Sequence, residues 1–445
     1  MVRELPPLKI VYATNWFGAP KFSQDEEIGR NCPIPEGYYF NLTEHKSWCT
    51  LTSDAKERSE AAGLILHAPD TVLNDLPPHV KNQPWILESM EAPFSSPFRA
   101  DEPLMKDFDY LASYNFKSSF LFSYFSPSVM DVVNRPLPKD FISTKKKGAP
   151  ILWIARNCRA VNGREAYIAK LREYVNIDSY GGCLNNKDFP LDKSRMELLA
   201  EYKFYLAAEN SNCDNYVTEK LSDTISMSAV PIVDGPPSYE GYVPSDRSII
   251  HMDAYPDPRD LADYINYLDR NDTAYLEYLS FRRDAINIPA KERLDPAFIN
   301  NWSDTIEYTK TSSYCSICRG MIPWWKAKQD GESYHEPNKD VFRVDDSCTD
   351  AGKWNYITQG PPYIPNWIPR APDEFTRPDF YALINNNGSA LANTTTIEEV
   401  VNDKGDAVMI ANGSFILLYI VFILVLLRIS KKSQTKNNNV VDPLL

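Results

Sequence analysis

Glycine and basic residues are both scarce in this chain of 445 residues. There are 17 glycines against 34 prolines, which favours ordered connections over flexible glycine-rich linkers. The 47 lysines and arginines are outnumbered by 60 acidic residues, so the net charge is −13. Nucleic acids and anionic membranes are bound mainly by basic surfaces. The composition therefore argues against a general binder of either class, although a local basic cleft for an anionic ligand remains compatible with it.

The chain also lacks a complete metal-binding motif and any internal repeat. Cys315-Ser-Ile-Cys318 has half of a zinc-ribbon spacing, but neither a second CxxC nor a histidine pair follows it. We therefore predict no metal site and no required cofactor.

The chain contains many cysteines and glycosylation sequons. The chain has eight cysteines, and Asn-X-Ser/Thr sequons occur at Asn41, Asn271, Asn301, Asn387, Asn393 and Asn412. Disulfides persist and sequons are used in the secretory pathway. We expect the folded part of the chain to lie in its lumen.

A long apolar run near the C-terminus predicts a transmembrane helix over residues 408–427. It holds about 20 residues before its first charge, which is the length needed to cross a bilayer core. Arg428, Lys431 and Lys432 follow, so the positive-inside rule places the tail 428–445 in the cytosol. We expect a single-pass protein of the Golgi or endoplasmic reticulum membrane. Met1–Pro7 shows no signal peptide, so how the folded part enters the lumen, and whether a signal segment precedes Met1, is left open.

Apolar runs of strand length alternate with helix-length segments in two blocks, which predicts an α/β fold of two Rossmann-like domains. The first block spans residues 1–140, with strands expected at 8–13, 63–68 and 83–88. A proline- and lysine-rich linker at 134–150 leads into the second block, 141–320. Its strands are expected at 151–155, 204–208, 230–234 and 248–252, and its helices at 164–174, 216–228 and 259–269. Residues 321–407 are rich in proline and asparagine and predict a semi-extended stalk.

The stretch from Phe204 to Lys220 carries the most informative chemistry. An apolar strand is followed by turn residues, and Asp214 or Asn215 is expected to cap the next helix. On that helix Tyr216, Glu219 and Lys220 are expected to share one face, opposite Val217, Leu221 and Ile225. A lysine at a helix N-terminus favours a bound phosphate, although an exposed, ion-rich first turn is an equally simple interpretation of the pattern.

This stretch also resembles a known family. Ala208-Glu-Asn-Ser211 followed by Tyr216-Val-Thr-Glu-Lys220 is similar to the donor-binding signature of the α1,3-fucosyltransferases, glycosyltransferase family 10. The resemblance covers roughly residues 8–320 and is densest at 150–285. Asp178-Ser-Tyr-Gly and Asn186-Lys-Asp are similar to a divergent animal branch that acts on proteins or has uncertain acceptors.

The resemblance implies a GT-B fold, in which two Rossmann-like domains face a cleft, and a GDP-fucose site in the second domain. Lys220 and Arg164 are expected to hold the diphosphate, with Arg156 and Arg159 as alternatives to Arg164. Glu219 is expected on the ribose hydroxyls and Tyr216 against the nucleotide. Glu209 and Asn210 close the strand beside the donor, although Glu209 could instead be a buried carboxylate that holds the turn.

The catalytic base is expected in the first domain. Trp85-Ile-Leu-Glu-Ser-Met-Glu-Ala-Pro93 resembles the family segment in which a glutamate before a small residue and proline acts as base. Glu91 has that position, and Glu88 is the rival. A nearby apolar wall of Met90 and Phe94 would raise the pKa of such a base toward neutrality.

In the family, a CxxC after the donor domain is bonded back to the N-terminal domain. The resemblance therefore implies that Cys315 and Cys318 pair with Cys32 and Cys49. Pairing among Cys158, Cys183, Cys213 and Cys348 is left open.

We therefore predict an inverting fucosyltransferase that moves L-fucose from GDP-fucose to a glycan GlcNAc, in α1,3 linkage, or to a protein Ser or Thr. The expected partners are GDP-fucose, a glycan or protein acceptor and the membrane, with no nucleic acid. The alternative is an inactive, membrane-anchored glycan-binding protein that keeps the fold. The intact cluster from Tyr216 to Lys220 argues against it, because such a protein needs no diphosphate site.

Overall fold

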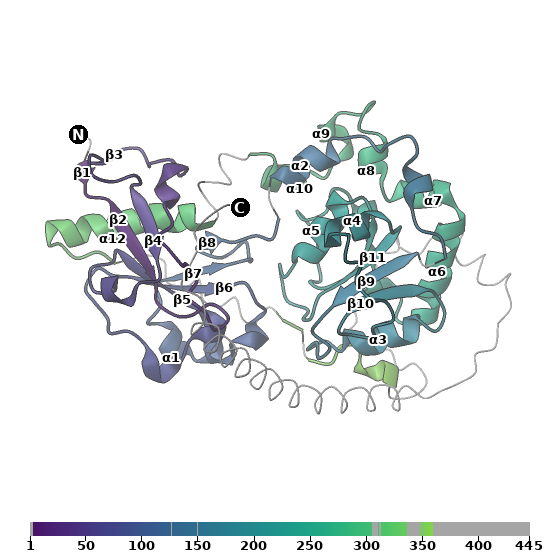
Figure 1. The fold of residues 1–445 in the computed structure, drawn as a ribbon, viewed down its shortest axis with the longest axis horizontal. Coiled ribbons are helices and arrows are strands. Elements are labelled where there is room, and N and C mark those ends of the chain that lie inside the picture. Colours follow the sequence, from purple (N-terminus) through teal and green to yellow (C-terminus); the bar gives the residue numbers. More distant parts are fainter. Residues whose placement is uncertain are drawn as a thin grey trace, which may run out of the picture. The chain divides into compact units, whose positions relative to one another are not determined.

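The computed structural model describes residues 3–125, 127–148, 150–304, 310, 313–335, 348–349 and 351–358. Two parallel sheets, each flanked by helices, carry most of the strands, so the predicted α/β class is confirmed (Figure 1). Within the described residues no helix is both long and apolar enough to cross a membrane. The expected transmembrane segment 408–427, its tail and the sequons at Asn387 and Asn393 lie outside the described residues.

The first sheet has six strands in the order β4-β2-β5-β6-β7-β8, and every neighbouring pair is parallel. Its strands are β2 (Leu8–Tyr12), β4 (Cys49–Thr52), β5 (Gly63–His67), β6 (Trp85–Ser89), β7 (Tyr110–Ser113) and β8 (Phe120–Leu121). The strands expected at 8–13, 63–68 and 83–88 are thus confirmed as β2, β5 and β6. A small separate sheet pairs β1 (Arg3–Leu5) with β3 (Tyr38–Phe40).

Alternate residues of this sheet enter two different cores, as the pleat of a strand requires. Ile10 and Ile65 pack on the face covered by helix α12 (Ser313–Asp330), whereas Val11 and Leu64 pack on the opposite face with Phe108. Gly63 permits the close approach of α12, because a Cβ at this position would stand 2.7 Å from the sulfur of Met321. The first sheet is therefore buried on both faces.

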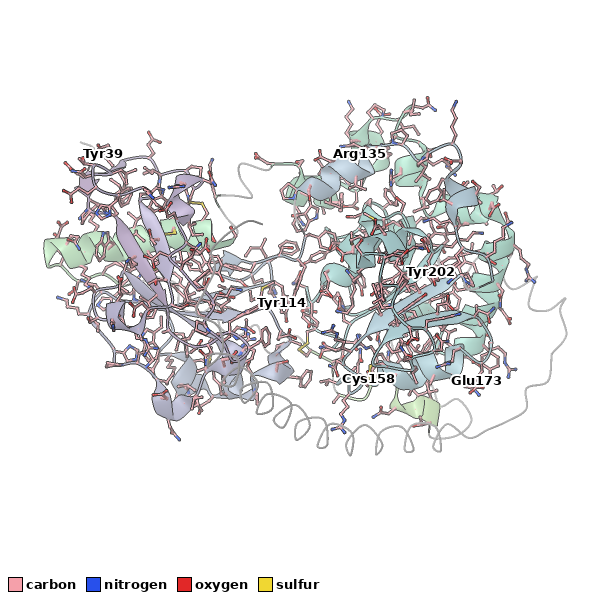
Figure 2. All side chains as sticks on the ribbon, viewed as in Figure 1. Tyr39, Tyr114, Arg135, Cys158, Glu173 and Tyr202 are labelled. Carbon is pink, nitrogen blue, oxygen red and sulfur yellow. A yellow bond between two sulfur atoms is a disulfide. The ribbon has the colours of Figure 1, made fainter. Side chains whose placement is uncertain are left out.

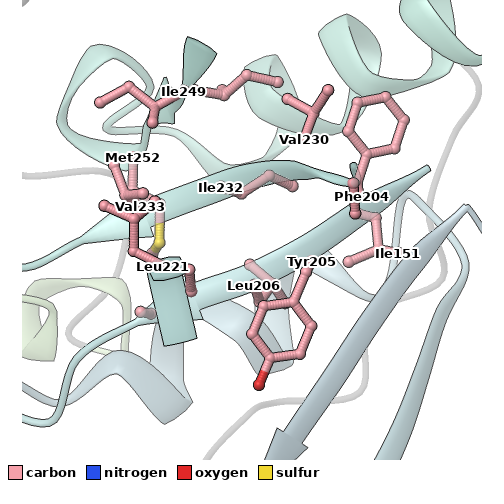
Figure 3. Packing of buried hydrophobic residues seen from close by; sticks show 14 of the residues in the cluster. Ile151, Phe204, Tyr205, Leu206, Leu221, Val230, Ile232, Val233, Ile249 and Met252 are labelled. Atoms are coloured by element: carbon pink, nitrogen blue, oxygen red, sulfur yellow. The ribbon is translucent and has the colours of Figure 1, made fainter. Parts of the chain in front are cut away.

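The second sheet has five parallel strands in the order β10-β9-β11-β12-β13. They are β9 (Ile151–Ala155), β10 (Ile177–Gly181), β11 (Phe204–Ala208), β12 (Val230–Asp234) and β13 (Ile250–His251). Both faces are covered, which explains why β9, β11 and β12 read as almost continuous apolar runs. Figure 3 shows Leu206 of β11 and Ile232 of β12 in this core, together with Leu221 of the helix that connects these two strands.

Helices connect and cover the strands of the second sheet. α3 (Arg164–Leu171) packs beside α6 (Pro258–Arg270), while α4 (Arg195–Ala200) and α5 (Glu219–Ser226) lie on the other side of the sheet (Figure 1). The remaining helices are short: α1 (Glu102–Met105), α2 (Ser128–Val133), α7 (Asp272–Glu277), α8 (Ser280–Arg283), α9 (Ala290–Arg293) and α10 (Pro296–Trp302).

The chain crosses between the two sheets at positions that the sequence did not indicate. Phe125 and α2 already belong to the core of the second sheet, although residues up to 140 were assigned to the first domain. α12 returns to the first sheet, where Ile317 and Met321 are fully buried. Residues 313–320 therefore pack with the first sheet and not, as expected, with the second.

The expectation of a stalk from residue 321 is wrong for part of that segment. Residues 321–330 continue α12, and Trp354 and Tyr356 are buried in the core of the second sheet. The proline-rich composition predicted extended chain, but two apolar side chains suffice to anchor a short segment in a core.

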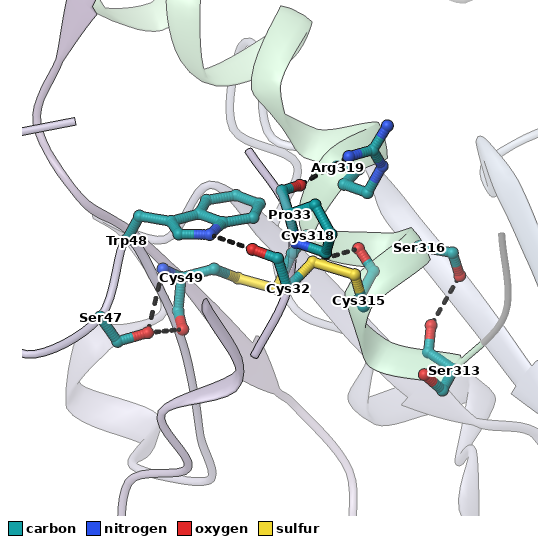
Figure 4. The surroundings of a disulfide bond; sticks show 10 residues. All are labelled: Cys32, Pro33, Ser47, Trp48, Cys49, Ser313, Cys315, Ser316, Cys318 and Arg319. Carbon is teal, nitrogen blue, oxygen red and sulfur yellow. Dashed lines mark hydrogen bonds between the residues drawn. A yellow bond between two sulfur atoms is a disulfide. The ribbon is translucent and has the colours of Figure 1, made fainter. Parts of the chain in front are cut away.

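Four disulfides join all eight cysteines. Cys32 is bonded to Cys315 and Cys49 to Cys318, so α12 is tied to the first domain as the family resemblance implies (Figure 4). Around them Trp48 Nε1 donates to the carbonyl of Cys32 at 2.9 Å, and Arg319 donates to the carbonyl of Pro33 at 2.6 Å. The pairs that the sequence left open are Cys158–Cys183 and Cys213–Cys348.

Candidate active site

Most of the predicted donor-site residues gather at the carboxyl ends of β9 and β11. The strand order places the first strand of this sheet, β9, between the second and the third, so the connections from β9 and β11 leave toward opposite faces. Ligands of open parallel sheets bind in the crevice at such a switch point. Arg164 begins the helix after β9, and Glu209 directly follows β11.

The helix after β11 begins later than the sequence predicted. α5 starts at Glu219, and the side chain of Thr218 accepts from the amide of Lys220 as its N-cap. Neither Asp214 nor Asn215 is the cap; Asn215 has φ of +60°, which turns the chain before the helix. Val217, Leu221 and Ile225 are buried as predicted.

Tyr216 consequently does not share a helical face with Glu219 and Lys220. It lies in the loop before α5, and only 3% of it is exposed. Its ring packs against Tyr114, labelled in Figure 2, with centroids 4.9 Å apart. The expected helical arrangement is wrong because the left-handed turn at Asn215 postpones the helix by one turn.

Glu209, Thr218 and Lys220 form the centre of the site. The buried carboxylate of Glu209 accepts hydrogen bonds from the amide of Thr218 at 2.9 Å and from its hydroxyl at 2.8 Å. Lys220 Nζ donates to Glu209 Oε2 at 2.9 Å and to Thr218 Oγ1 at 2.8 Å. Glu209 thus holds the turn, as one of the two interpretations of the sequence proposed, and it also fixes Lys220.

The electrostatics keep Lys220 charged. Burial would lower the pKa of Lys220, but the carboxylates of Glu209 and Glu219 outweigh it and raise that pKa. Burial raises the pKa of Glu209, while Lys220 and the amide of Thr218 oppose the rise. The side chain of Lys220 keeps 20% of its surface exposed and stands in the first turn of α5, where the helix dipole is positive.

Glu219 is the more open carboxylate of the cluster. About half of its side chain, 47%, is exposed, and Lys220 Nζ lies 3.5 Å from Oε1. Burial would raise the pKa of Glu219, but Lys220 and Arg195 outweigh it and lower that pKa. An ionised, accessible carboxylate can accept hydrogen bonds from the paired hydroxyls of a ribose. Arg195 of α4, which the sequence analysis did not select, is ion-paired with Asp223.

Arg164 is buried, and backbone carbonyls already occupy most of its guanidinium. It is 2% exposed, and its terminal nitrogens donate to the carbonyls of Ala208 and Asn157, at 2.5 Å and 3.2 Å. Its Nε, like Oδ1 of Asn210, is buried without a hydrogen bond to any residue that the structure describes. Arg156 and Arg159 are exposed in the loop after β9 and stay alternatives.

Tyr216 connects Glu91 to the loop that leads into α5. The phenol of Tyr216 donates to Glu91 Oε2 at 3.4 Å. Met90 and Ala92, which flank Glu91, pack in a small apolar cluster with Tyr114 and Tyr216. Phe94, expected in the apolar wall, is instead exposed.

Glu88, the rival base, points into a different environment. It is the penultimate residue of β6, is 2% exposed and accepts a hydrogen bond from the phenol of Tyr314 at 3.0 Å. Burial raises the pKa of Glu88, and Lys21 and Tyr314 reduce the rise. This geometry favours Glu91 over Glu88 as the group that can reach a donor at Lys220.

The first sheet has a switch point of its own, between β2 and β5. His67 ends β5, and its Nδ1 lies 2.6 Å from Asp70 Oδ2. Asp70 also accepts from the amides of Phe17 and Gly18, at 2.7 Å and 3.0 Å, and Lys21 Nζ stands 3.7 Å from the ring centroid of Trp16. The sequence analysis missed these residues, because they belong to two short segments, 16–21 and 67–70, that only the fold brings together.

Nothing in the described part of the chain resembles a metal centre: no group of three or more His, Cys, Asp or Glu residues there could hold an ion. Of the sequons that the structure describes, Asn41 is exposed, whereas Asn271 caps α7 and Asn301 donates to the carbonyl of Gly241 at 3.3 Å.

Comparison with known proteins finds a family model that matches the part of the chain carrying this site. Residues 143–334 match the family model described as "Glycosyltransferase family 10 (fucosyltransferase) C-term". The resemblance to glycosyltransferase family 10 is confirmed. The matched segment, the family 10 domain, includes all six predicted donor-site residues: Arg164, Glu209, Asn210, Tyr216, Glu219 and Lys220.

Curated relatives carry fucosyltransferase names. The chain is 28% identical over 289 residues to GDP-fucose protein O-fucosyltransferase 3 of Xenopus laevis, covering 61% of each chain. It is 30% identical over 292 residues to the protein of that name from Gallus gallus, covering 60% of each. It is 27% identical over 263 residues to Alpha-(1,3)-fucosyltransferase B of Drosophila melanogaster, covering 55% of this chain and 59% of the relative. The chain thus spans about three fifths of the length of the relatives that it matches.

A crystal structure of an alpha1,3-fucosyltransferase with GDP-fucose is similar with a TM-score of 0.44 and 18% identity, covering 76% of this chain and 95% of that one.

Proposed function

We propose that this protein is a GDP-fucose-dependent fucosyltransferase with two domains of GT-B type. The observation that carries the proposal is the Glu209–Thr218–Lys220 cluster at the start of α5, inside the family 10 domain. A charged, partly exposed lysine at a helix N-terminus and a sheet switch point suits a diphosphate.

The donor-site residues have distinct tasks in this proposal. Lys220 and the amides of the first turn of α5 bind the diphosphate, and Arg164 adds positive charge from below. Asn210 Oδ1 is buried without a hydrogen bond within the described residues, and Arg164 Nε has only an ion-pair contact with Glu165 Oε1 at 3.7 Å. We expect a bound donor to give both atoms hydrogen-bond partners. Glu219 accepts from the ribose hydroxyls.

The reaction is a direct displacement that inverts the donor's β-linkage to an α-linkage. The acceptor hydroxyl oxygen attacks the anomeric carbon of fucose and forms the new bond. The bond from that carbon to the phosphate oxygen breaks, and its electron pair leaves with GDP. Glu91 accepts the hydroxyl proton, while Lys220 stabilises the charge that develops on the diphosphate.

The acceptor is a hydroxyl of a protein Ser or Thr in our first proposal and of a glycan GlcNAc in the second. Sequence segments similar to the protein-acting branch and the similarity to relatives named protein O-fucosyltransferase favour the first. The carboxyl edge of the first sheet, with His67, Asp70 and Trp16, is the place where we expect the acceptor, because ligands of parallel sheets bind at that edge.

We also propose a single-pass location in the Golgi or endoplasmic reticulum membrane with the catalytic part in the lumen. The apolar run 408–427 and the lysines after it support this proposal, as do four disulfides in the folded part. Resistance of the full chain to alkaline extraction from membranes, with protease protection of the folded part, is the expected result. Release into the soluble fraction would refute the anchor.

The test of the function is a transfer assay. Radiolabelled GDP-fucose is offered to the full chain with folded, disulfide-bonded protein domains and with oligosaccharides that end in GlcNAc. Label on the protein domains is expected, and label on oligosaccharides alone would select the second acceptor. If the protein binds GDP-fucose but labels neither class and releases no GDP, the inactive glycan-binding alternative replaces the proposal.

A further inference from the structure

A short segment beyond the residues matched by the family model packs against the donor-binding loops. Residues 348–349 and 351–358, here called the strap, follow the family 10 domain in sequence. Cys348 is bonded to Cys213, and the amide of Thr349 donates to the carbonyl of Asn212 at 2.8 Å. The amides of Gly352 and Trp354 donate to the carbonyls of Val161 and Asn162, at 2.7 Å and 2.9 Å. The strap therefore binds both loops that carry donor-site residues.

Two strap side chains enter the core beneath these loops. Lys353 is 2% exposed and Trp354 is fully buried. Lys353 Nζ donates to Asp234 Oδ1 at 2.7 Å and is ion-paired with Asp253, and Trp354 Nε1 donates to Asp234 Oδ2 at 2.6 Å. Burial would lower the pKa of Lys353, but Asp234 and Asp253 outweigh it and raise that pKa, which favours the charged ammonium.

Asp234 connects the strap to the donor site. The side-chain amides of Asn162 and Asn212 donate to its two oxygens at 3.1 Å and 2.7 Å. Asn162 also donates to the carbonyl of Glu209 at 3.0 Å, and the amide of Glu209 donates to the carbonyl of Asp234 at 2.6 Å. Because the carboxylate of Glu209 also binds Thr218 and Lys220, an unbroken series of hydrogen bonds and backbone links joins Lys353 to Lys220.

The strap also reaches the side of the site where the base is expected. Cys213, its partner Cys348 and Tyr216 lie in one apolar cluster with Met90 and Ala92, the neighbours of Glu91. The strap disulfide therefore belongs to the same apolar cluster as the neighbours of Glu91.

We propose that Lys353 is a positioning residue for donor binding: through Asp234 it fixes the loop from Glu209 to Asn215, so that Lys220 stands where the diphosphate binds. This inference rests on the proposed function. It extends the donor-binding unit to residue 358 and assigns Lys353 no contact with the substrate. An alternative in which the strap only stabilises the fold predicts no specific effect on GDP.

The test compares Lys353→Met with Lys203→Met in the full chain. Lys203 is a matched control: it is 5% exposed, pairs with Asp269 and Asp272, and precedes β11 at the end of the sheet opposite the donor loops. Both variants are expected to lower the melting temperature. Only Lys353→Met is expected to weaken GDP binding in calorimetry, by about tenfold or more, and to raise KM for GDP-fucose more than it lowers kcat. Lys353→Arg is expected to recover part of the loss.

The double variant Asp234→Asn with Lys353→Met removes both buried charges. It replaces the single variant in the GDP titration if Lys353→Met does not fold. Equal GDP affinity in the folded variant and the wild type would overturn the inference, as would equal weakening by Lys203→Met. If the wild type itself binds no GDP, the proposed function fails, and the inference fails with it.

Discussion

The phenol of Tyr216 donates a hydrogen bond to Glu91 Oε2 at 3.4 Å, although the two residues are 125 positions apart in sequence. Tyr216 stands between the proposed base and the donor loop, and burial raises its pKa well above the usual tyrosine range. The phenol therefore stays protonated and can only donate to the carboxylate. This contact joins Glu91 to the loop that precedes α5.

Tyr216→Phe should slow transfer with little effect on the fold. The phenylalanine keeps the packing against Tyr114 but removes the phenol that donates a hydrogen bond to Glu91. Loss of a hydrogen bond of about 1.4 kcal/mol corresponds to about tenfold in rate. Turnover at saturating GDP-fucose measures the effect. Tyr264→Phe is the control, since it loses a buried hydrogen bond with Tyr278 far from the site. An unchanged rate in Tyr216→Phe would mean that the contact does not serve catalysis.

Glu91→Gln should reduce transfer by about 10²–10⁴, the usual contribution of a general base, while GDP binding survives. Glu88→Gln should cost much less, because a glutamine can still accept the hydrogen bond from Tyr314. The two variants are compared in one turnover assay. If Glu88→Gln is the inactive one, the two roles must be exchanged, and if both keep the full rate the base lies elsewhere.

Peptide mapping without reduction should recover Cys32 with Cys315 and Cys49 with Cys318. Their sequence separations are 283 and 269 residues, so either bond alone should stabilise the fold by roughly 5–6 kcal/mol through the unfolded chain. Replacing both Cys49 and Cys318 by serine should therefore lower the melting temperature strongly. Free thiols with stoichiometric zinc at these positions would contradict the assignment.

The stability of the protein should rise with pH between about 7 and 10. Burial lowers the pKa of Lys145 to about 7, whereas the unfolded chain keeps the ordinary value of 10.5. Across that window the unfolded state binds the extra proton, so raising the pH favours the folded state. Denaturant titrations of wild type and Lys145→Met at pH 7 and pH 10 measure this, and the gain should be smaller in the variant. An equal gain in both would assign the pH dependence to other groups.

The sequence predicted those features that a local pattern or a family motif encodes. Apolar runs located the strands β2, β5, β6, β9, β11 and β12, and the motif from Glu209 to Lys220 located the donor cluster. The start of α5 was placed wrongly because the left-handed conformation of Asn215 is not visible in residue type. Lys353 was missed because its partner Asp234 is 119 positions away and its surroundings are rich in proline. Contacts of that separation follow from the folded cores and not from periodicity.

The central claim is that the cluster at the start of α5 binds the diphosphate of GDP-fucose. The most direct measurement is a calorimetric titration of GDP into the wild type and into Glu209→Gln with Lys220→Met. The double variant is chosen because removal of Lys220 alone would leave the buried carboxylate of Glu209 without its cation. Lys170→Met is the control, because it removes a partly exposed lysine of α3 that pairs with Glu173. The account predicts that the double variant loses about 10²-fold or more in GDP affinity while the control keeps it. Unchanged affinity in the folded double variant would contradict the account.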